Sequence, residues 1–433
     1  MALTQLKTSG IADDAVTEDK IANAINTARA ANTAKDLTAL SAANLTSGTI
    51  PDARFPAALP AASGANLTNV PARTNLGING AFTVAQSATN YLGAVSSTTS
   101  TGYNFFDRWQ VNHSVQADPT TDQSDVASGT TPYTLGFRKA LKITNGNQSK
   151  GATASSIFYI RQFIESQNVA QSGWNYTDPN SKITLSFWIK SRVAQSFHGH
   201  LRSQDGTDQR YPYQTGALTA NTWTKITKVI PGNSNLQFDT DTTTNANDRG
   251  LDIVICPYMG TTYTDSSATF DQWQGEAAAN FAGQDMTTTW FTTNDATLEI
   301  TGVQIEVGST ASPFAHESYT ETLAKCQRYL YKITVGINSA YQFKTFHRFS
   351  GSAGHAYYDI NFPVEMRADP SFSQDGTTYS ATGYTGDVIL QRAFRNSASL
   401  KSNISNVAAN GNVYLRPNNT SGSYLNLLLG AEL

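Results

Sequence analysis

Apolar and polar residues alternate along much of the chain, which is the pattern of β-strands that have one face in a core. The clearest case is residues 182–191, KITLSFWIKS, in which every second residue is Ile, Leu, Phe or Ile. The residues between them are Thr, Ser, Trp and Lys. Runs of similar length occupy residues 156–165, 221–230 and 251–259, and the last is apolar on both faces, as in a central strand.

A change of phase interrupts the alternation in residues 296–308, ATLEITGVQIEVG. Apolar residues fall on even-numbered positions as far as Ile300 and on odd-numbered positions from Val303 onward. A one-residue slip at Gly302 is what a β-bulge produces. The strands are short, lie between loops rich in Asn, Gly, Asp and Pro, and have no helical pattern between them. This predicts a mainly β fold, with an antiparallel two-sheet sandwich or jelly roll over residues 79–318.

The sequence after this sandwich predicts a short linker helix over residues 319–332. Pro313 and Phe314 fix the exit from the last strand, the proline through its restricted backbone and the phenylalanine by filling the edge of the core. Ser318 and Glu321 have the S-x-x-E spacing of a capping box. The apolar residues that recur behind it at helical spacing are Tyr319, Leu323, Cys326 and Leu330. We expect this helix to be structural, covered either by the β regions on its two sides or by copies of itself at an axis.

Strand character returns with YLYKITVGI, so residues 333–433 are expected to form a C-terminal β-rich head. Residues 1–78 differ from all the rest, because Phe55 is the only aromatic residue among them. Such a segment buries little apolar area by itself. It is nevertheless patterned, since ANLT occurs twice and a helix capped by Thr17 would carry a narrow apolar stripe through Ile21. An extended shaft made of several identical chains is expected here, and a disordered tail is the alternative.

The composition of the chain argues against several classes of function. The 433 residues are 15% charged, with a formal net charge of −3. A chain with few Lys and Arg is not expected to bind nucleic acid, because that affinity comes mainly from neutralised phosphates. The chain starts without a secretory signal and has no apolar run of about 18 residues, so we expect synthesis in the cytoplasm and no membrane insertion. Cys256 and Cys326 give neither a disulfide framework nor a metal pair, and Cys256 is expected in the core.

The stretch GVQIEVGSTASPFAHESYTETLAKCQRYLYK, residues 302–332, carries a recognisable pattern. A Q-(I/L)-E-x-G strand end leads through P-F to an L-x-x-C-Q-R-Y-(L/Y)-(Y/W) helix. The matching residues are Gln304, Glu306, Gly308, Pro313, Phe314, Leu323, Cys326, Gln327, Arg328, Tyr329 and Tyr331. This pattern resembles the linker of tail-fibre and receptor-binding proteins of tailed bacteriophages.

Other segments agree with that resemblance in the same order along the chain. They are IADDAVTEDKIANAI and LTSGTIPDARFP near the start, then INGAFTVAQ, YNFFDRW, ANDRGLDIVI and INFPVEMRADPSF. The resemblance implies a homotrimeric fibre in the virion that attaches to phage tail or baseplate proteins by its N-terminus. It also implies a distal head on the host cell-surface polysaccharide, and a middle domain similar to the galactose-binding-like fold of carbohydrate-binding modules. The resemblance is weakest in the region after Tyr379.

Motifs for catalysis or metal binding are not found in the sequence. There is no G-x-S-x-G elbow, H-E-x-x-H or phosphate-binding loop, so we expect no catalytic residue, cofactor or metal. His198 and His200 fall on the same side of a strand, and are either half of a metal site or both solvent-facing. The stretch 239–248 carries oxygen ligands of the kind that Ca²⁺ prefers, but an Asn- and Asp-rich turn has the same composition.

Three tryptophans are candidates for stacking on sugar rings. Trp188 falls on the polar face of its strand, Trp223 lies in TANTWTK, and Trp273 lies in DQWQGE. Each of them has an alternative role in sheet packing or in contacts between copies of the chain. Trp109 is expected in the core.

Two stretches of the C-terminal region, residues 343–360 and 375–387, combine Tyr, His, Arg and Gly in the manner of recognition loops. The candidate glycan-binding residues there are His355, Tyr357, Tyr358, Tyr379 and Tyr384. The alternative is a hairpin surface in which these tyrosines pair across strands.

Together these features favour a non-enzymatic tail fibre that recognises host surface glycan. A polysaccharide depolymerase would need two carboxylates at set distances across a groove, commonly on a long β-helix, and the main body has no solenoid repeats of about 20 residues. A structural tail connector without a receptor role is a further alternative. A cellular carbohydrate-binding protein is less favoured, because the sequence lacks a signal peptide.

Overall fold

The computed structural model describes residues 74–86, 90–92, 100–103, 106–114, 119–146, 151–238, 249–275, 282–336, 346–350, 353–376, 388–405 and 424–432. By its internal contacts the chain divides into two units, residues 1–66 and 67–433. The predicted shaft lies outside the described residues except for its last few positions, and the candidate calcium stretch 239–248 lies outside them entirely. The described structure therefore belongs to the second unit.

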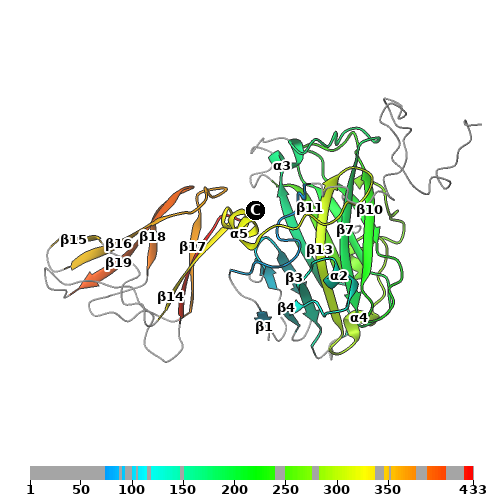
Figure 1. The fold of residues 1–433 in the computed structure, drawn as a ribbon, viewed down its shortest axis with the longest axis horizontal. Helices are drawn as coiled ribbons and strands as arrows, with labels where there is room; N and C mark the ends of the chain where they lie inside the picture. Colours follow the sequence, from blue (N-terminus) through cyan, green and yellow to red (C-terminus); the bar gives the residue numbers. More distant parts are fainter. Residues whose placement is uncertain are drawn as a thin grey trace, which may run out of the picture. The chain divides into compact units, whose positions relative to one another are not determined.

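Two antiparallel sheets confirm the predicted sandwich (Figure 1). Among the described residues, the six-stranded sheet runs in the order β1 (Asn90–Leu92), β4 (Thr120–Asp125), β5 (Lys139–Thr144), β13 (Thr297–Val307), β7 (Lys182–Ser191) and β10 (Thr224–Pro231). The seven-stranded sheet runs in the order β12 (Gln274–Gly275), β9 (Gln209–Gln214), β8 (His198–Ser203), β11 (Arg249–Met259), β6 (Ile157–Glu165), β3 (Gln110–Ser114) and β2 (Ser100–Gly102). The chain crosses from one sheet to the other between β5 and β6 and again between β6 and β7, as it does in a jelly roll.

Side-chain alternation explains where the core lies. Ile183, Leu185, Phe187 and Ile189, the apolar residues of β7, are all fully buried between the two sheets. β11 pairs with both β6 and β8, so it is a central strand as expected, and residues on both of its faces, such as Val254 and Ile255, are buried. Trp109 lies in the same core, as expected.

The bulge predicted in β13 is confirmed at Gly302. The pairing of β13 with β7 shifts register between Thr301 and Gln304. Gly302 has a φ of 65°, in the left-handed region that favours glycine. A Cβ at this position would lie 2.6 Å from the ring of Phe137. The bulge changes the phase of the strand, so that Val303 beyond it also reaches the core.

Among the described residues short helices connect the strands, and the longest of these is the linker helix. They are α2 (Thr131–Thr134), α3 (Ser166–Ala170), η7 (Thr261–Tyr263), α4 (Thr289–Thr292) and α5 (Tyr319–Gln327). The predicted capping box at the start of α5 is confirmed. The backbone N–H of Glu321 donates to the Ser318 hydroxyl at 3.3 Å, and the backbone N–H of Ser318 donates to the Glu321 carboxylate at 2.8 Å.

The predicted extent of the linker helix, residues 319–332, is wrong at its C-terminal end. α5 ends at Gln327, and Leu330 already begins β14, where it pairs with Gly430 of β20. Pairing with a strand from a distant part of the chain therefore overrides the local helical spacing. Tyr319 is also 58% exposed, so it does not belong to the buried side of the helix.

The segment before α5 packs on the six-stranded sheet, but the expectation that Phe314 fills the edge of the core is wrong. The ring of Phe314 packs edge-on against that of Phe137, with centroids 4.9 Å apart. Pro313 is exposed beside it. Phe314 therefore covers an apolar cluster on the outer face of this sheet, and not the core between the two sheets.

The C-terminal region is β-rich, as predicted. Among the described residues, one sheet runs β14 (Leu330–Gly336), β20 (Tyr424–Gly430) and β17 (Ser371–Gly376), and another runs β15 (Phe346–Ser350), β16 (Ala353–Asn361), β19 (Ser397–Ser405) and β18 (Ile389–Phe394). Both sheets contribute to one small core that includes Ile360, Leu400, Leu427 and Leu429.

Cys256 lies in the sandwich core, as expected, and both cysteines are buried free thiols. None of the helices in the described part of the chain has the length and hydropathy that a membrane span requires.

We expect Gly302→Ala to lower the free energy of unfolding by about 2 kcal/mol or more. Alanine would have to adopt the left-handed backbone conformation, and its Cβ would collide with the Phe137 ring. Gly129→Ala is the matched control, because Gly129 has a φ of 82° but no atom within 4 Å of an added Cβ. Unfolding in urea measures both variants, and equal losses would contradict the role given to the contact with Phe137.

Candidate functional site

The structure brings two of the predicted tryptophans onto the outer face of the six-stranded sheet. Trp188 on β7 pairs across the strands with Lys225 of β10, and Trp223 lies just before β10. The Lys190 ammonium lies 5.1 Å from the centre of the Trp223 ring. Both tryptophans are half-buried and pack against the cluster that contains Phe137. They therefore take part in packing, the alternative role considered for them.

The third predicted tryptophan, Trp273, lies elsewhere. Its indole N–H donates to the carbonyl of Pro231 at 2.7 Å, and its ring meets that of Tyr211 edge-on at 5.4 Å. The indole is half-buried against the sandwich core. Trp273 is thus positioned by packing and is not brought next to Trp188 or Trp223.

The candidates of the C-terminal region have mixed outcomes. His355 and Tyr357 are half-buried on β16, with ring centroids 6.2 Å apart. Tyr358 was a wrong choice, because it is only 1% exposed and its hydroxyl lies 3.2 Å from that of Ser402 inside the small core. Neighbouring residues of a strand face opposite sides, so only one of the two adjacent tyrosines can point outward. Tyr379 and Tyr384 lie outside the described residues.

The suggestion that His198 and His200 both face solvent is wrong, because His198 is 6% exposed and His200 is fully buried. Burial lowers the pKa of both imidazoles. Gly199 between them is needed for packing, since a Cβ there would lie 2.3 Å from the phenol group of Tyr213. Within the described residues no group of three or more His, Cys, Asp or Glu side chains could hold a metal ion.

Charged and aromatic residues connect the linker to the sandwich in a network that we call the junction, defined by Arg108, Glu165, Arg328, Tyr329 and Glu432. Nε and Nη2 of Arg328 each donate to the Glu165 carboxylate at 3.1 Å. The Tyr329 hydroxyl donates to the same carboxylate. The guanidinium carbon of Arg108 lies 3.5 Å from the centre of the Tyr329 ring, and Arg108 also forms an ion pair with Glu432.

Four of the segments that carry the sequence resemblance meet at or beside this junction. FDRW and CQRY supply three of its five members. Gln86, at the end of INGAFTVAQ, donates its side-chain N–H to the carbonyl of Leu330 at 2.7 Å. Arg367, in the EMRADP segment, donates its backbone N–H to the carbonyl of Arg328 at 2.8 Å. Residues that are far apart in the sequence are therefore contact partners here.

Hydrogen bonding fixes the charge state of Glu165. Burial alone would raise the pKa of this carboxyl, but the hydrogen bonds from Arg328 and Tyr329 hold it below its ordinary value. Burial also raises the pKa of Tyr329 to about 12, so its phenol remains a hydrogen-bond donor. The junction is thus held by an ionised carboxylate that accepts from three donor atoms of the linker.

We expect Glu165→Gln to lower the free energy of unfolding by about 3 kcal/mol near pH 7. The loss should shrink as the pH falls through the depressed pKa of Glu165, below about 4.5, because the wild-type carboxylate then protonates as well. Urea unfolding of the wild-type protein and of Glu165→Gln, at pH 7 and at a pH below about 4.5, measures the difference in the free energy of unfolding. Glu317→Gln, which removes one member of the partly exposed ion pair with Lys325, is the control and should cost at most about 1 kcal/mol. A pH-independent difference would contradict this account.

The outer face of the seven-stranded sheet carries a group of polar residues that the sequence reasoning missed. We call it the polar face, and its residues are Gln110, Asn112, Tyr159, Arg161, His200, Arg202, Arg210, Arg249 and Asp252. Cross-strand pairing joins Gln110 with Arg161, and Arg202 with both Asp252 and Arg210. The alternate residues of the same strands fill the core.

Aromatic stacking and hydrogen bonds hold these arginines in place. The guanidinium carbons of Arg161 and Arg249 lie 4.4 and 4.1 Å from the centre of the Phe163 ring. Nε of Arg161 donates to the side-chain oxygen of Gln110 at 2.5 Å. Arg202 forms an ion pair with Asp208 at 2.5 Å. The guanidinium groups are therefore pre-positioned by the fold, and Arg161, Arg202 and Arg249 remain half-buried rather than sealed.

Asp252 lies among the charges of the polar face. It is 1% exposed, and burial raises its pKa to about 7, although the four arginines Arg161, Arg202, Arg249 and Arg210 all act to lower it. The sequence did contain a signal for this face, because each of the four strands β6, β8, β9 and β11 carries an arginine. Only the strand register shows that these arginines converge.

No family profile and no curated protein sequence matches the chain. Solved structures do match it. One is the enzymatically active domain of tailspike protein 4 of bacteriophage CBA120, at 10% identity and a TM-score of 0.26. That match covers 47% of this chain and 20% of the other, so the chain spans about a fifth of the tailspike domain.

Two carbohydrate-binding modules are also similar. The family 11 module of Clostridium thermocellum, in complex with a mixed-linked tetrasaccharide, matches at 10% identity over 49% of this chain and 97% of that chain, with a TM-score of 0.22. A xylan-binding domain from CBM 22 matches at 9% identity over 50% of this chain and 99% of that chain, with a TM-score of 0.25.

Proposed function

We propose that this chain is a non-enzymatic tail-fibre protein of a tailed bacteriophage, present in the virion as a homotrimer. Its N-terminus attaches to the tail or baseplate, and its sandwich recognises a host surface glycan through the polar face. The observation that carries the glycan-binding role is the convergence of four arginines on that face, with Arg202 directly opposite Arg210.

Stability alone does not account for this arrangement. Like charges directly opposite each other on neighbouring strands are destabilising, and a stable sheet would place an acidic or apolar residue at one of the two positions. Departures from such local rules are expected at functional sites, where binding compensates for the cost. The pair Arg202 and Arg210 is such a departure, and both of its strands have a paired neighbour on each side.

The chemistry of the polar face suits a glycan that carries acidic groups. Guanidinium groups bind carboxylates in a bidentate manner and also donate to sugar hydroxyls. The carboxamides of Gln110 and Asn112 are buried beneath the arginines and support them: Nδ2 of Asn112 donates to the side-chain oxygen of Gln110 at 3.2 Å, and Nε of Arg161 donates to the same oxygen. The half-buried ring of Tyr159, which is paired across the strands with Asn112, offers an apolar surface for the C–H face of a sugar.

The tail-fibre part of the proposal is supported by the junction. The motifs that resemble phage fibre linkers are contact partners there, so their order along the chain corresponds to one packed arrangement of a sandwich followed by a β-rich region. The proposal that the chain attaches to the tail is based on the resemblance of residues 1–78 to segments of phage tail fibres. The proposal that it forms a homotrimer is based on the same resemblance.

We expect Arg202→Gln to weaken binding to an acidic bacterial surface polysaccharide about tenfold or more, because a charge-assisted hydrogen bond contributes about 1.5–3 kcal/mol. An array of acidic and neutral bacterial polysaccharides identifies the ligand, and titration calorimetry measures the affinity. Binding should also fall with rising salt concentration.

Lys139→Gln is the matched control for this variant. It removes the same charge from the six-stranded sheet, where Lys139 forms an exposed ion pair with Asp125. Parent and variants should scatter light alike, as trimers, which verifies that the assembly is intact. Equal affinity of the parent and Arg202→Gln, or binding to no polysaccharide of the array, would contradict the glycan-binding role.

A further inference from the structure

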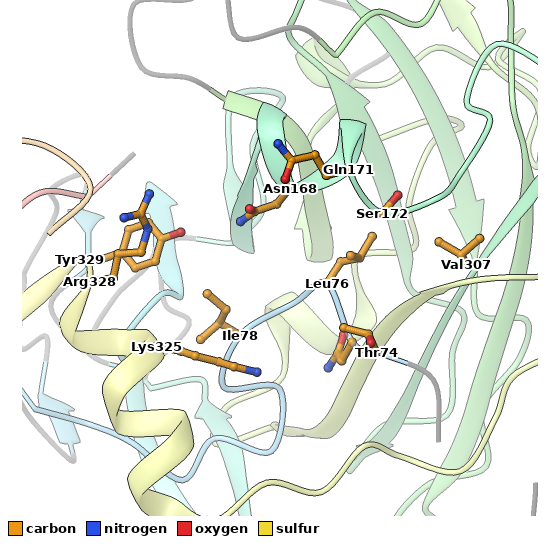
Figure 2. Close-up of a pocket in the computed structure, with 11 residues that line it drawn as sticks. Thr74, Leu76, Ile78, Asn168, Gln171, Ser172, Val307, Lys325, Arg328 and Tyr329 are labelled. Carbon is orange, nitrogen blue, oxygen red and sulfur yellow. The ribbon is translucent and has the colours of Figure 1, made fainter. Parts of the chain in front are cut away.

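A cavity of about 780 Å³ lies between the helices α3 and α5 (Figure 2). Its walls come from residues 74–78, from α3 and the turn after it, from the end of β13, and from the end of α5. None of the residues that line it belongs to the polar face. The volume falls within the range of about 300–1,000 Å³ that is typical of small-molecule sites.

The apolar part of the cavity is aliphatic and rigid. It is made by Leu76, Ile78 and Val307. The backbone N–H of Leu76 donates to the carbonyl of Ile305 at 2.9 Å, and the N–H of Ile78 donates to the side chain of Gln162 at 2.7 Å. These bonds tie the segment to both sheets, because Ile305 lies on β13 and Gln162 on β6.

The polar part of the cavity contains carboxamide and ammonium groups on different sides. Asn168 and Gln171 come from α3 and the position after it, and both are exposed. Lys325 comes from the last turn of α5 (Figure 2). Its ion pair with Glu317 joins two partly exposed side chains, so a ligand can replace that partner at little cost.

The aromatic and guanidinium groups that line the cavity, those of Tyr329 and Arg328, already bind Glu165. Tyr329 is 1% exposed, with its hydroxyl on Glu165, and Arg328 holds the same carboxylate. No exposed aromatic plane is therefore found among the described lining residues for stacking on a sugar ring. An aliphatic surface of this kind fits a methyl group, and neighbouring carboxamides fit an amide.

We propose that this cavity binds an oligosaccharide of N-acetylated amino sugars. The acetamido methyl group lies on Leu76, Ile78 and Val307, and the acetamido N–H and C=O pair with the carboxamides of Asn168 and Gln171. Lys325 donates to a ring hydroxyl. The site is separate from the polar face, so it stands even if the polar face binds no glycan.

Calorimetric titration of the full chain with N,N′-diacetylchitobiose tests this proposal, with cellobiose as the matched ligand that lacks the acetamido groups. We expect the acetylated disaccharide to bind at least about tenfold more tightly than cellobiose. Gln171→Ala should weaken its binding about three- to tenfold, the effect of losing one or two hydrogen bonds.

Gln391→Ala is the control, because Gln391 is also exposed but lies on β18, away from the cavity. Arg202→Gln should likewise leave this binding unchanged, which separates the cavity from the polar face. Equal binding of the two disaccharides, no binding of either, or an unchanged affinity in Gln171→Ala would overturn the proposal.

Discussion

Successive side chains of a β-strand point to opposite faces of its sheet, and the rest of this structure depends on that constraint. A strand that fills the core with every second residue must present the others on the outer face. On β7 the outward residues include Trp188, which packs beside Phe137. On the seven-stranded sheet they form the polar face. Core and candidate site are therefore two sides of the same strands, and a slip of one residue would exchange them. At the bulge at Gly302, β13 changes which of its alternate residues face the core.

The junction provides the second organising element. Glu165 lies at the end of β6 and is only 1% exposed, so its charge requires partners. Arg328 and Tyr329 supply them just after α5 ends, and Tyr329 in turn carries the guanidinium of Arg108 on its ring. A single buried carboxylate thus explains why the linker carries Arg and Tyr side by side.

Much of the fold could be predicted from the sequence because alternation and capping are local signals. The strands of the sandwich, the bulge at Gly302 and the capping box at Ser318 are examples. The end of α5 could not be predicted, because it depends on pairing of Leu330 with Gly430, which local spacing does not report. The same holds for Tyr358, whose burial is set by the register of β16 and not by its type.

The candidate site was harder to foresee than the fold. In the sequence each arginine of the polar face appears as an isolated charge within a strand. Only the pairing of β8 with β9 and β11 places Arg202 beside Arg210 and Asp252. Aromatic residues were the more familiar signal for glycan binding, yet Trp188 and Trp273 are largely engaged in packing. Residue type therefore pointed to the tryptophans as the candidate site, whereas the strand pairing brings the arginines of the polar face together.

A crystal structure of the full chain with an acidic oligosaccharide of the recognised polysaccharide tests the central claim most directly. The account predicts that the sugar lies on the polar face, with an acidic group within hydrogen-bond distance, about 3.2 Å or less, of Arg161 or Arg202. A sugar bound at His355 and Tyr357 of the C-terminal region, with the polar face empty, would contradict it.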